Sequence, residues 1–298
     1  MEQRIFTLFA RTPIHVGAGN SVGAIDSPIT RERHTRIPII PGSALKGVLA
    51  DMWPPVPTKK RNSKETGAGE EQQQKTPEQV ERELIFGRED NAGALLVGEA
   101  RVLAFPLRSA RGAFAWITCP LALQRFVRDS GKEQLEQYIP VLKNDTSNEM
   151  FCVSGADILT GGKVILEEYV FTADQNQSEK LTKIEEEFKS LADDPVWPLM
   201  KGHLAVISNE MFSYFVENAC EVVTRIRIDD VTGTVKGSAL FNQEQIPSET
   251  LLYSVLGWQQ EKESKWNALC GRLAGNGNQL QVGGDETIGL GCCSVKLI

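Results

Sequence analysis

The sequence predicts an α+β protein on four observations. Strand-like and helix-like segments interleave along the chain without the regular strand–helix–strand repeat of a doubly wound sheet. Residues 6–11 alternate between two faces, which indicates a half-buried strand. Residues 42–52 place apolar side chains at i, i+3, i+4 and i+7, which predicts a helix that opens after Pro41. Residues 220–241 alternate on both sides of a short turn, which indicates a β-hairpin.

The remaining elements follow from the same periodicities within a single expected domain, residues 1–298. Residues 54–83 are polar, rich in Gly, Gln and Glu and without periodicity, so a flexible excursion is expected there. Further strands are expected over 94–107, 112–119, 164–171, 203–207 and 290–297. Further helices are expected over 121–127, 178–191 and 264–273.

Composition is that of an ordinary globular protein. Of the 298 residues 41% are hydrophobic, and no run approaches the roughly 18 apolar residues of a membrane span. Six cysteines lack any CxxC spacing, so core thiols are expected in place of a disulfide framework or zinc site. We therefore expect a cytoplasmic protein with no membrane partner.

The net charge of −7 hides an asymmetry. Residues 1–62 hold nine Lys or Arg against four Asp or Glu, whereas the remainder holds 23 against 35. A basic first part can bind a phosphate backbone locally although the whole chain is acidic. Such a chain would bind free RNA poorly and favours binding sites that are built by assembly.

A long glycine-bearing loop carries one carboxylate, Asp26. Its position between loop glycines and Pro28 predicts an exposed carboxylate that can reach a ligand, and the alternative is an aspartate that only stabilises the turn. His15 could position or protonate a leaving group, or it could be a packed imidazole. His203 lies in an apolar strand and is expected in the core.

Candidate phosphate-binding residues follow in the chain. A basic run comes after Asp26, and the helix start combines free backbone N–H groups with a hydroxyl and an ammonium group. The late glycine loop permits close backbone approach, but it lacks the GxxxxGK[ST] pattern of a nucleoside triphosphate site and could be a tight turn. The hairpin offers an extended basic ribbon. The candidates are Arg31, Arg33, His34, Arg36, Gly42, Ser43, Lys46, Arg225, Arg227, Lys236, Gly283, Gly284, Glu286 and Thr287.

Three segments together give the sequence a specific resemblance. TPIHVGAG, SVGAIDSPITRERHTRIPIIPGSALKG and QVGGDETIGLG, in this order, resemble the RAMP superfamily of CRISPR proteins, in particular the repeated backbone subunits of type III-B (Cmr) effector complexes. The middle segment EVVTRIRIDDVTGTVKGSALF matches in kind, so the resemblance spans most of the chain. It implies an RRM/ferredoxin-like core in which the glycine loop and first helix meet beside one sheet face.

The resemblance also implies function and partners. These are guide RNA, single-stranded target RNA, further copies of the chain packed head-to-tail and other Cmr subunits. The residue that matches Asp26 is required for target cleavage in the family, and the hairpin corresponds to a thumb that wedges across the guide–target duplex. An endoribonuclease is therefore expected, with Asp26 acting as a base or holding a weakly bound Mg²⁺ or Mn²⁺.

One departure and two alternatives stay open. Many relatives carry an acidic-plus-tyrosine stretch after the hairpin, whereas residues 242–245 here read NQEQ and leave only Glu244. The first alternative is a purely structural guide-binding subunit with an inert Asp26. The second, a repeat-processing endonuclease acting alone, fits poorly because it favours a basic monomer with a histidine-centred site.

Overall fold

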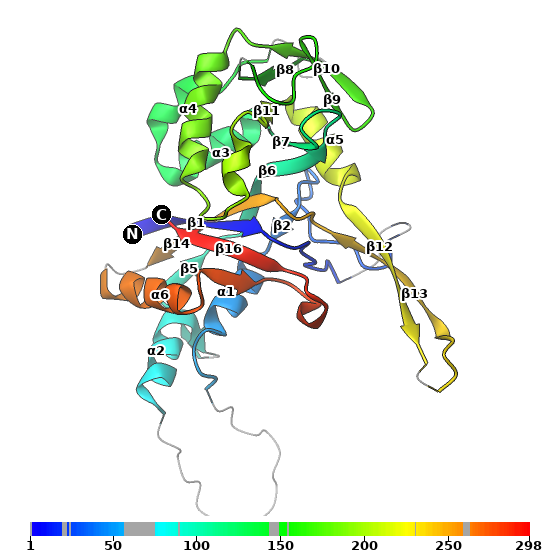
Figure 1. The fold of residues 1–298 in the computed structure, drawn as a ribbon. Helices are drawn as coiled ribbons and strands as arrows, with labels where there is room; N and C mark the ends of the chain where they lie inside the picture. The colour runs from blue at the N-terminus through cyan, green and yellow to red at the C-terminus, as the bar shows by residue number, and fades with distance from the viewer. Residues whose placement is uncertain are drawn as a thin grey trace, which may run out of the picture.

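The computed structural model describes residues 2–19, 23, 25–56, 75–88, 90–142, 149–153, 155–229, 231–258 and 263–298, without the side chains of residues 227, 236–239 and 263–265. Its centre is a βαββαβ unit whose parts lie far apart in the sequence (Figure 1). The unit comprises β1 (Glu2–Ala10), α1 (Gly42–Ala50), β6 (Ala100–Arg108), β14 (Leu251–Trp258), α6 (Glu263–Gly275) and β16 (Cys292–Leu297). The strands lie in the order β16-β1-β14-β6, and each neighbouring pair is antiparallel. This arrangement confirms the predicted α+β class and the ferredoxin-like core.

β1 is the central strand of this unit, and it is buried on both faces from Ile5 to Ala10. Phe6 and Leu8 pack in one apolar core with residues of α1 and α6, whereas Ile5 and Phe9 belong to a second core on the other face. The expectation of a half-buried strand was therefore wrong. A second layer of the chain covers the face that carries Phe9, where a one-sided sheet would have met water.

That second layer comes from the long connection between β6 and β14, at the top of Figure 1. It extends the sheet beyond β6 in the order β7-β11-β8-β10-β9 and covers it with helices that fill the second core. The strands are β7 (Phe114–Thr118), β8 (Glu149–Cys152), β9 (Lys163–Leu166), β10 (Tyr169–Asp174) and β11 (Leu204–Val206). The helices of the second core are α3 (Pro120–Ser130) and α4 (Ser178–Lys189), with 3-10 turns η1 (Glu133–Tyr138) and η2 (Trp197–Met200). The third helix of this connection, α5 (Asn209–Asn218), packs in the first core through Phe212, Phe215 and Val216.

Shorter elements complete the description. β2 (Ile39–Ile40) pairs with β6, β5 (Leu95–Val97) pairs with β14, and β15 (Gln279–Gln281) pairs with β16. β3 (Gly87–Arg88) and β4 (Asn91–Ala92) pair with each other, and η3 (Glu286–Ile288) follows β15. The described cysteines are free thiols, of which Cys119, Cys152, Cys220 and Cys293 lie in the core as expected, whereas Cys270 and Cys292 are partly exposed. Among the described residues, no helix is long and apolar enough to cross a membrane.

Two helices that the periodicity of apolar residues did not predict, α2 and α5, begin at residues that cap them. The predicted flexible excursion 54–83 was wrong at its end, because α2 (Pro77–Phe86) begins there with a capping box between Thr76 and Gln79. Residues 57–74 of that excursion lie outside the described part of the chain. α5 was missed although Ser208 caps its start by accepting a hydrogen bond from the Met211 amide (3.2 Å).

The strand expected over 164–171 is in fact the β9–β10 hairpin. The chain reverses at Glu167, whose φ of 50° is uncommon for a residue with a side chain. The turn is only two residues long, so the sequence pattern does not reveal where the chain reverses.

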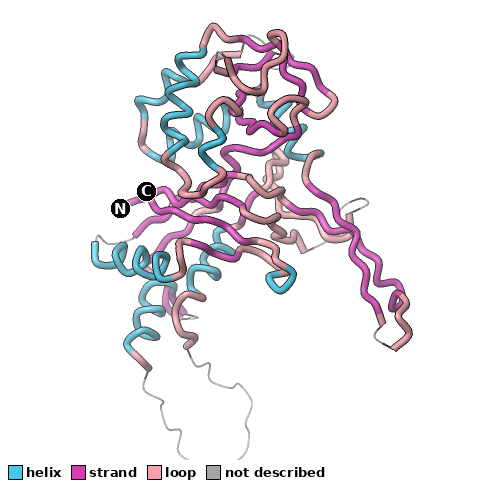
Figure 2. The backbone as a smooth tube through the Cα atoms, viewed as in Figure 1, coloured by secondary structure: helices cyan, strands magenta, loops and turns pink. Residues whose placement is uncertain are grey.

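The hairpin predicted over 220–241 is present and longer than expected. It consists of β12 (Glu221–Ile228) and β13 (Val235–Gln245), and we call it the thumb hairpin. It stands away from the rest of the chain (Figure 2). Its exposed apolar side chains are Val222, Val223, Ile226, Ile228, Val231, Val235, Leu240 and Phe241. So much apolar exposure on one projecting element is typical of a surface that contacts a partner.

Candidate functional site

The loop that carries Asp26 is attached to the base of the thumb hairpin. Ser27 forms a parallel bridge with Gln243: its amide donates to the Asn242 carbonyl, and its carbonyl accepts from the Glu244 amide (both 3.0 Å). The Asn242 amide donates to Oδ2 of Asp26 (2.9 Å). Among the described residues, nothing hydrogen-bonds to Oδ1 of this exposed carboxylate, so Asp26 presents one fixed and one open oxygen.

His15 lies behind this loop, where its side chain holds Ser27. Nδ1 lies 2.7 Å from the Glu244 carbonyl and Nε2 lies 3.1 Å from the Ser27 hydroxyl. A carbonyl only accepts, so Nδ1 carries a proton and donates to it, while Nε2 hydrogen-bonds to the Ser27 hydroxyl, which can donate or accept. His15 is 7% exposed, and both its nitrogens are engaged. This geometry argues against the expected catalytic role and gives His15 a positioning role.

The glycine loop closes against the same place. The Gly284 amide donates to the His15 carbonyl (2.9 Å), and the Gly291 amide donates to the Pro13 carbonyl (2.8 Å). A Cβ at Gly283 would lie 2.2 Å from the His15 carbonyl oxygen, so this position requires glycine. Gln243 then donates through Nε2 to Oδ2 of Asp285 in the loop (2.6 Å). The loop of Asp26, the segment that contains His15 and the glycine loop therefore meet at residues 242–244 of β13.

Arg31 was expected to bind RNA, and the structure contradicts this. Its side chain is only 4% exposed and donates to Oε1 of Glu244 (2.6 Å) and to the Val216 carbonyl (2.9 Å). The other carboxylate oxygen of Glu244 accepts from the Ile29 amide (3.0 Å). Both groups are consumed in a buried ion pair, so Glu244 is not the cleavage assistant that its place after the hairpin suggested.

The rest of the basic run remains accessible. Arg33 is exposed, and His34 is 72% exposed beside Arg125 and Glu32. Arg36 forms an ion pair with Glu217 that is nearly half exposed on both sides. Exposed pairs of this kind stabilise little, about 0–1 kcal/mol, so Arg36 is free to exchange its partner for a phosphate.

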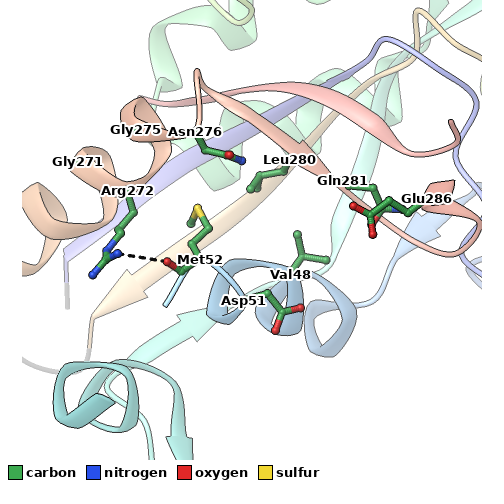
Figure 3. A pocket seen from close by; sticks show the side chains of 10 residues that line it. All are labelled: Val48, Asp51, Met52, Gly271, Arg272, Gly275, Asn276, Leu280, Gln281 and Glu286. Atoms are coloured by element: carbon green, nitrogen blue, oxygen red, sulfur yellow. Dashed lines mark hydrogen bonds between the residues drawn. The ribbon is translucent and has the colours of Figure 1, made fainter. Parts of the chain in front are cut away.

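The candidate residues of α1 divide by exposure. Ser43 is exposed and Lys46 is half-buried, which leaves both able to meet a phosphate. Gly42 has a packing role, because a Cβ there would lie 2.4 Å from the Val97 carbonyl oxygen. Val48 of α1 and the residues Asp51 and Met52 that follow the helix line a cavity of about 610 Å³ together with Glu286 of the glycine loop (Figure 3). The helix and the loop therefore meet, as expected.

The glycine-loop and thumb candidates have mixed outcomes. Gly283, Gly284, Glu286 and Thr287 are exposed. Arg225 is half-buried, and its Nε donates to Oε1 of Gln243, so part of its guanidinium group is bound within the chain. The side chains of Arg227 and Lys236 lie outside the described part of the structure. His203, expected in the core, is 16% exposed at its side chain and lies 4.0 Å from Asp157.

The residues around Asp26 do not form a metal site of their own. Across the described residues, no group of three or more His, Cys, Asp or Glu side chains could hold a metal ion. The nearby carboxylates of Glu244 and Asp285 are bound to Arg31 and Gln243. Mg²⁺ prefers six oxygen ligands, and this chain offers one open carboxylate oxygen, so the set does not fit a resident ion.

Comparisons with known proteins identify the class. The family model of the RAMP superfamily matches residues 7–294. The chain belongs to the RAMP superfamily.

Within that superfamily, Cmr4 subunits are among the similar proteins. The chain is 34% identical, over its whole length and 96% of the relative, to "CRISPR system Cmr endoribonuclease Cmr4" of Pyrococcus furiosus. A crystal structure of oligomeric Cmr4 from P. furiosus superposes with a TM-score of 0.70 at 28% identity, covering all of this chain and 98% of that one. A type III-B Cmr-beta complex bound to cognate target RNA contains a chain with the same fold, with a TM-score of 0.70, 20% identity, and coverage of 100% and 97%.

The buried ion pair predicts a large asymmetry between two glutamates of this region. Glu244→Ala leaves Arg31 buried without its counter-ion and the Ile29 amide without its acceptor, so it should cost about 3–5 kcal/mol of unfolding free energy. Glu217→Ala removes only the exposed partner of Arg36 and should cost less than about 0.5 kcal/mol. Urea unfolding of both variants measures the difference. Equal losses would mean that the Arg31–Glu244 pair does not hold the loop.

Proposed function

We propose that this chain is the repeated backbone subunit of a type III-B CRISPR effector complex, where it binds guide RNA and cuts complementary target RNA. The observation that carries the proposal is the exposed carboxylate of Asp26, anchored to the thumb strand in a chain 34% identical over its full length to a named endoribonuclease. Its partners are guide RNA, target RNA, other Cmr subunits and copies of itself, and its location is the cytoplasm. Copies pack head-to-tail, so a closed dimer as the only assembly would contradict this part.

The proposed chemistry uses the open oxygen of Asp26. Oδ1 takes the proton of the target 2′-hydroxyl, and the 2′-oxygen attacks the adjacent phosphorus in line. The P–O5′ bond breaks, the 5′-oxygen leaves with the electron pair and takes a proton from water, and Asp26 returns its proton to the solvent, so the products carry a 2′,3′-cyclic phosphate and a 5′-hydroxyl. The backbone bond from Asn242 to Oδ2 keeps the carboxylate oriented while its other oxygen reacts.

A divalent ion enters this proposal only from solution. Mg²⁺ or Mn²⁺ would be held weakly by Asp26 together with RNA phosphates and water, and it would supply charge neutralisation at the phosphate. If the wild-type complex cleaves at an unchanged rate in excess chelator, a divalent ion does not take part in the reaction.

Asp26→Asn should separate binding from cleavage. The amide oxygen of asparagine accepts the same bond from Asn242, so the loop and the assembly should persist, while loss of the base should lower cleavage about 100-fold or more. Asp193→Asn removes a different, exposed carboxylate that pairs with Lys296, and it should cut like wild type. Labelled target RNA in the assembled complex measures both. Normal cutting by Asp26→Asn refutes the assignment, and a wild type that binds but never cuts supports the purely structural alternative.

Guide binding is proposed to rest on phosphate contacts at Ser43, Lys46, Arg33, His34, Arg36 and the glycine loop. Lys46→Ala should weaken guide binding equally for all spacer sequences and reduce the salt slope by about one, because a phosphate contact carries no sequence information. Lys183→Ala, which removes a half-exposed lysine of α4, should leave both unchanged. Loss that depends on the spacer sequence would show base readout instead.

The thumb hairpin is proposed to wedge across the guide–target duplex with its exposed apolar side chains. Its tip is closed by internal bonds, from the Asp229 amide to the Thr234 carbonyl (2.8 Å) and from the Gly233 amide to the Asp229 carbonyl (2.9 Å). Deleting residues 229–236 should therefore leave the fold intact and abolish regular spacing of the cuts. An unchanged product ladder would refute the wedge.

A further inference from the structure

The side chain of Gln243 is the polar centre of the site, and it is 4% exposed. Its Oε1 accepts from Nε of Arg225 in β12 and from Nε2 of Gln245 (3.3 Å). Its Nε2 donates to Oδ2 of Asp285 in the glycine loop (2.6 Å). A guanidinium group only donates and a carboxylate only accepts, so the two partners fix which way the amide points.

These bonds belong to a closed ring that contains the loop of Asp26. The backbone of Gln243 bridges Ser27, the hydroxyl of Ser27 bonds to His15, and the carbonyl of His15 accepts from Gly284. Gly284 precedes Asp285, whose carboxylate returns to the side chain of Gln243. A change in any member therefore shifts the loop on which Asp26 sits.

Asp285 is the least secured member of the ring. It is exposed and its φ is 65°, in the left-handed region that residues with a side chain seldom occupy. The bond from buried Gln243 ties this exposed loop to the base of the thumb hairpin. A residue at 243 must accept from Arg225 and donate to Asp285 at once, which an amide does and a carboxylate or ammonium group does not.

We infer that Gln243 is a positioning residue for cleavage: it holds the Asp26 loop, the glycine loop and the thumb hairpin in one register. The inference rests on the proposed function, because cleavage is what the register serves.

A polarity swap tests this inference. Gln243→Glu places a carboxylate against that of Asp285, so single-turnover cleavage by the assembled complex should fall about 10- to 100-fold with target binding nearly unchanged. Asp285→Asn alone keeps an acceptor for Gln243, so it should lose less rate than Gln243→Glu, and its own rate is the reference for the double variant. In the double variant the new amide at position 285 donates to the carboxylate at 243, so the rate should return to within about threefold of that reference. Gln137→Glu adds the same charge on an exposed turn and should change nothing.

Further readouts keep the outcomes distinct. Asp285→Gly removes the acceptor while keeping the positive φ accessible, so it should lose rate like Gln243→Glu even if that variant folds poorly. The urea midpoint should fall in Gln243→Glu and recover in the double variant, whether or not the complex cuts. A wild type without cleavage overturns the proposed function, and the midpoints then decide whether Gln243 holds the loops. Wild-type rates in Gln243→Glu and Asp285→Gly, or no recovery in the double variant, overturn the inference.

Discussion

The hydrogen bonding of β13 at residues 242–244 is the constraint on which the candidate site depends. On one edge these residues pair with β12, and on the other edge Ser27 takes the place of a third strand. Backbone N–H and C=O groups that are buried must be paired, so this short bridge fixes the loop as firmly as a strand would. Asp26 consequently owes its place to the thumb hairpin together with the bonds of its own loop, in which the Ala18 amide donates to the Pro28 carbonyl and the Thr30 amide to the Val16 carbonyl.

The buried groups around this bridge serve it. Both ring nitrogens of His15 are hydrogen-bonded, one to the Glu244 carbonyl and the other to the Ser27 hydroxyl. The carboxylate of Glu244 accepts hydrogen bonds from Arg31 and from the Ile29 amide. A buried charge that loses its partner costs several kcal/mol, so these residues reinforce one another. At this bridge one oxygen of the Asp26 carboxylate has no hydrogen-bond partner among the described residues, and the proposed reaction uses that oxygen.

Much of the fold could be predicted from the sequence, because its cues are local. The periodicity of α1 and the alternation of β12 and β13 predicted the helix and the hairpin, and the glycine loop was recognised by its composition. The sequence also contains local cues for the start of α2, namely Thr76, Pro77 and Gln79. The polar composition around these residues favours a flexible segment, which outweighs such short cues when only the sequence is considered. β1 was placed correctly, but its second covered face depends on residues more than a hundred positions away.

The contacts within the site could not be predicted, because the partners lie far apart in the sequence. Arg31 meets Glu244 across 213 positions and Gln243 meets Asp285 across 42, and no periodicity links either pair. A basic run read from sequence alone therefore overstates the charge available to RNA. With Arg31 buried in its ion pair, the acidic chain offers a narrower basic surface than the sequence suggested, which is consistent with guide binding that is completed by assembly.

Amide hydrogen exchange on the intact chain tests most directly whether residues 242–244 hold the three segments as one unit. The relevant amides are those of Ser27, Asn242, Glu244 and Gly284, each of which donates across the site. The account predicts that all four exchange with one common opening free energy, well above that of Gly233 at the hairpin tip. Independent exchange of Ser27 and Gly284, each as fast as Gly233, would contradict it.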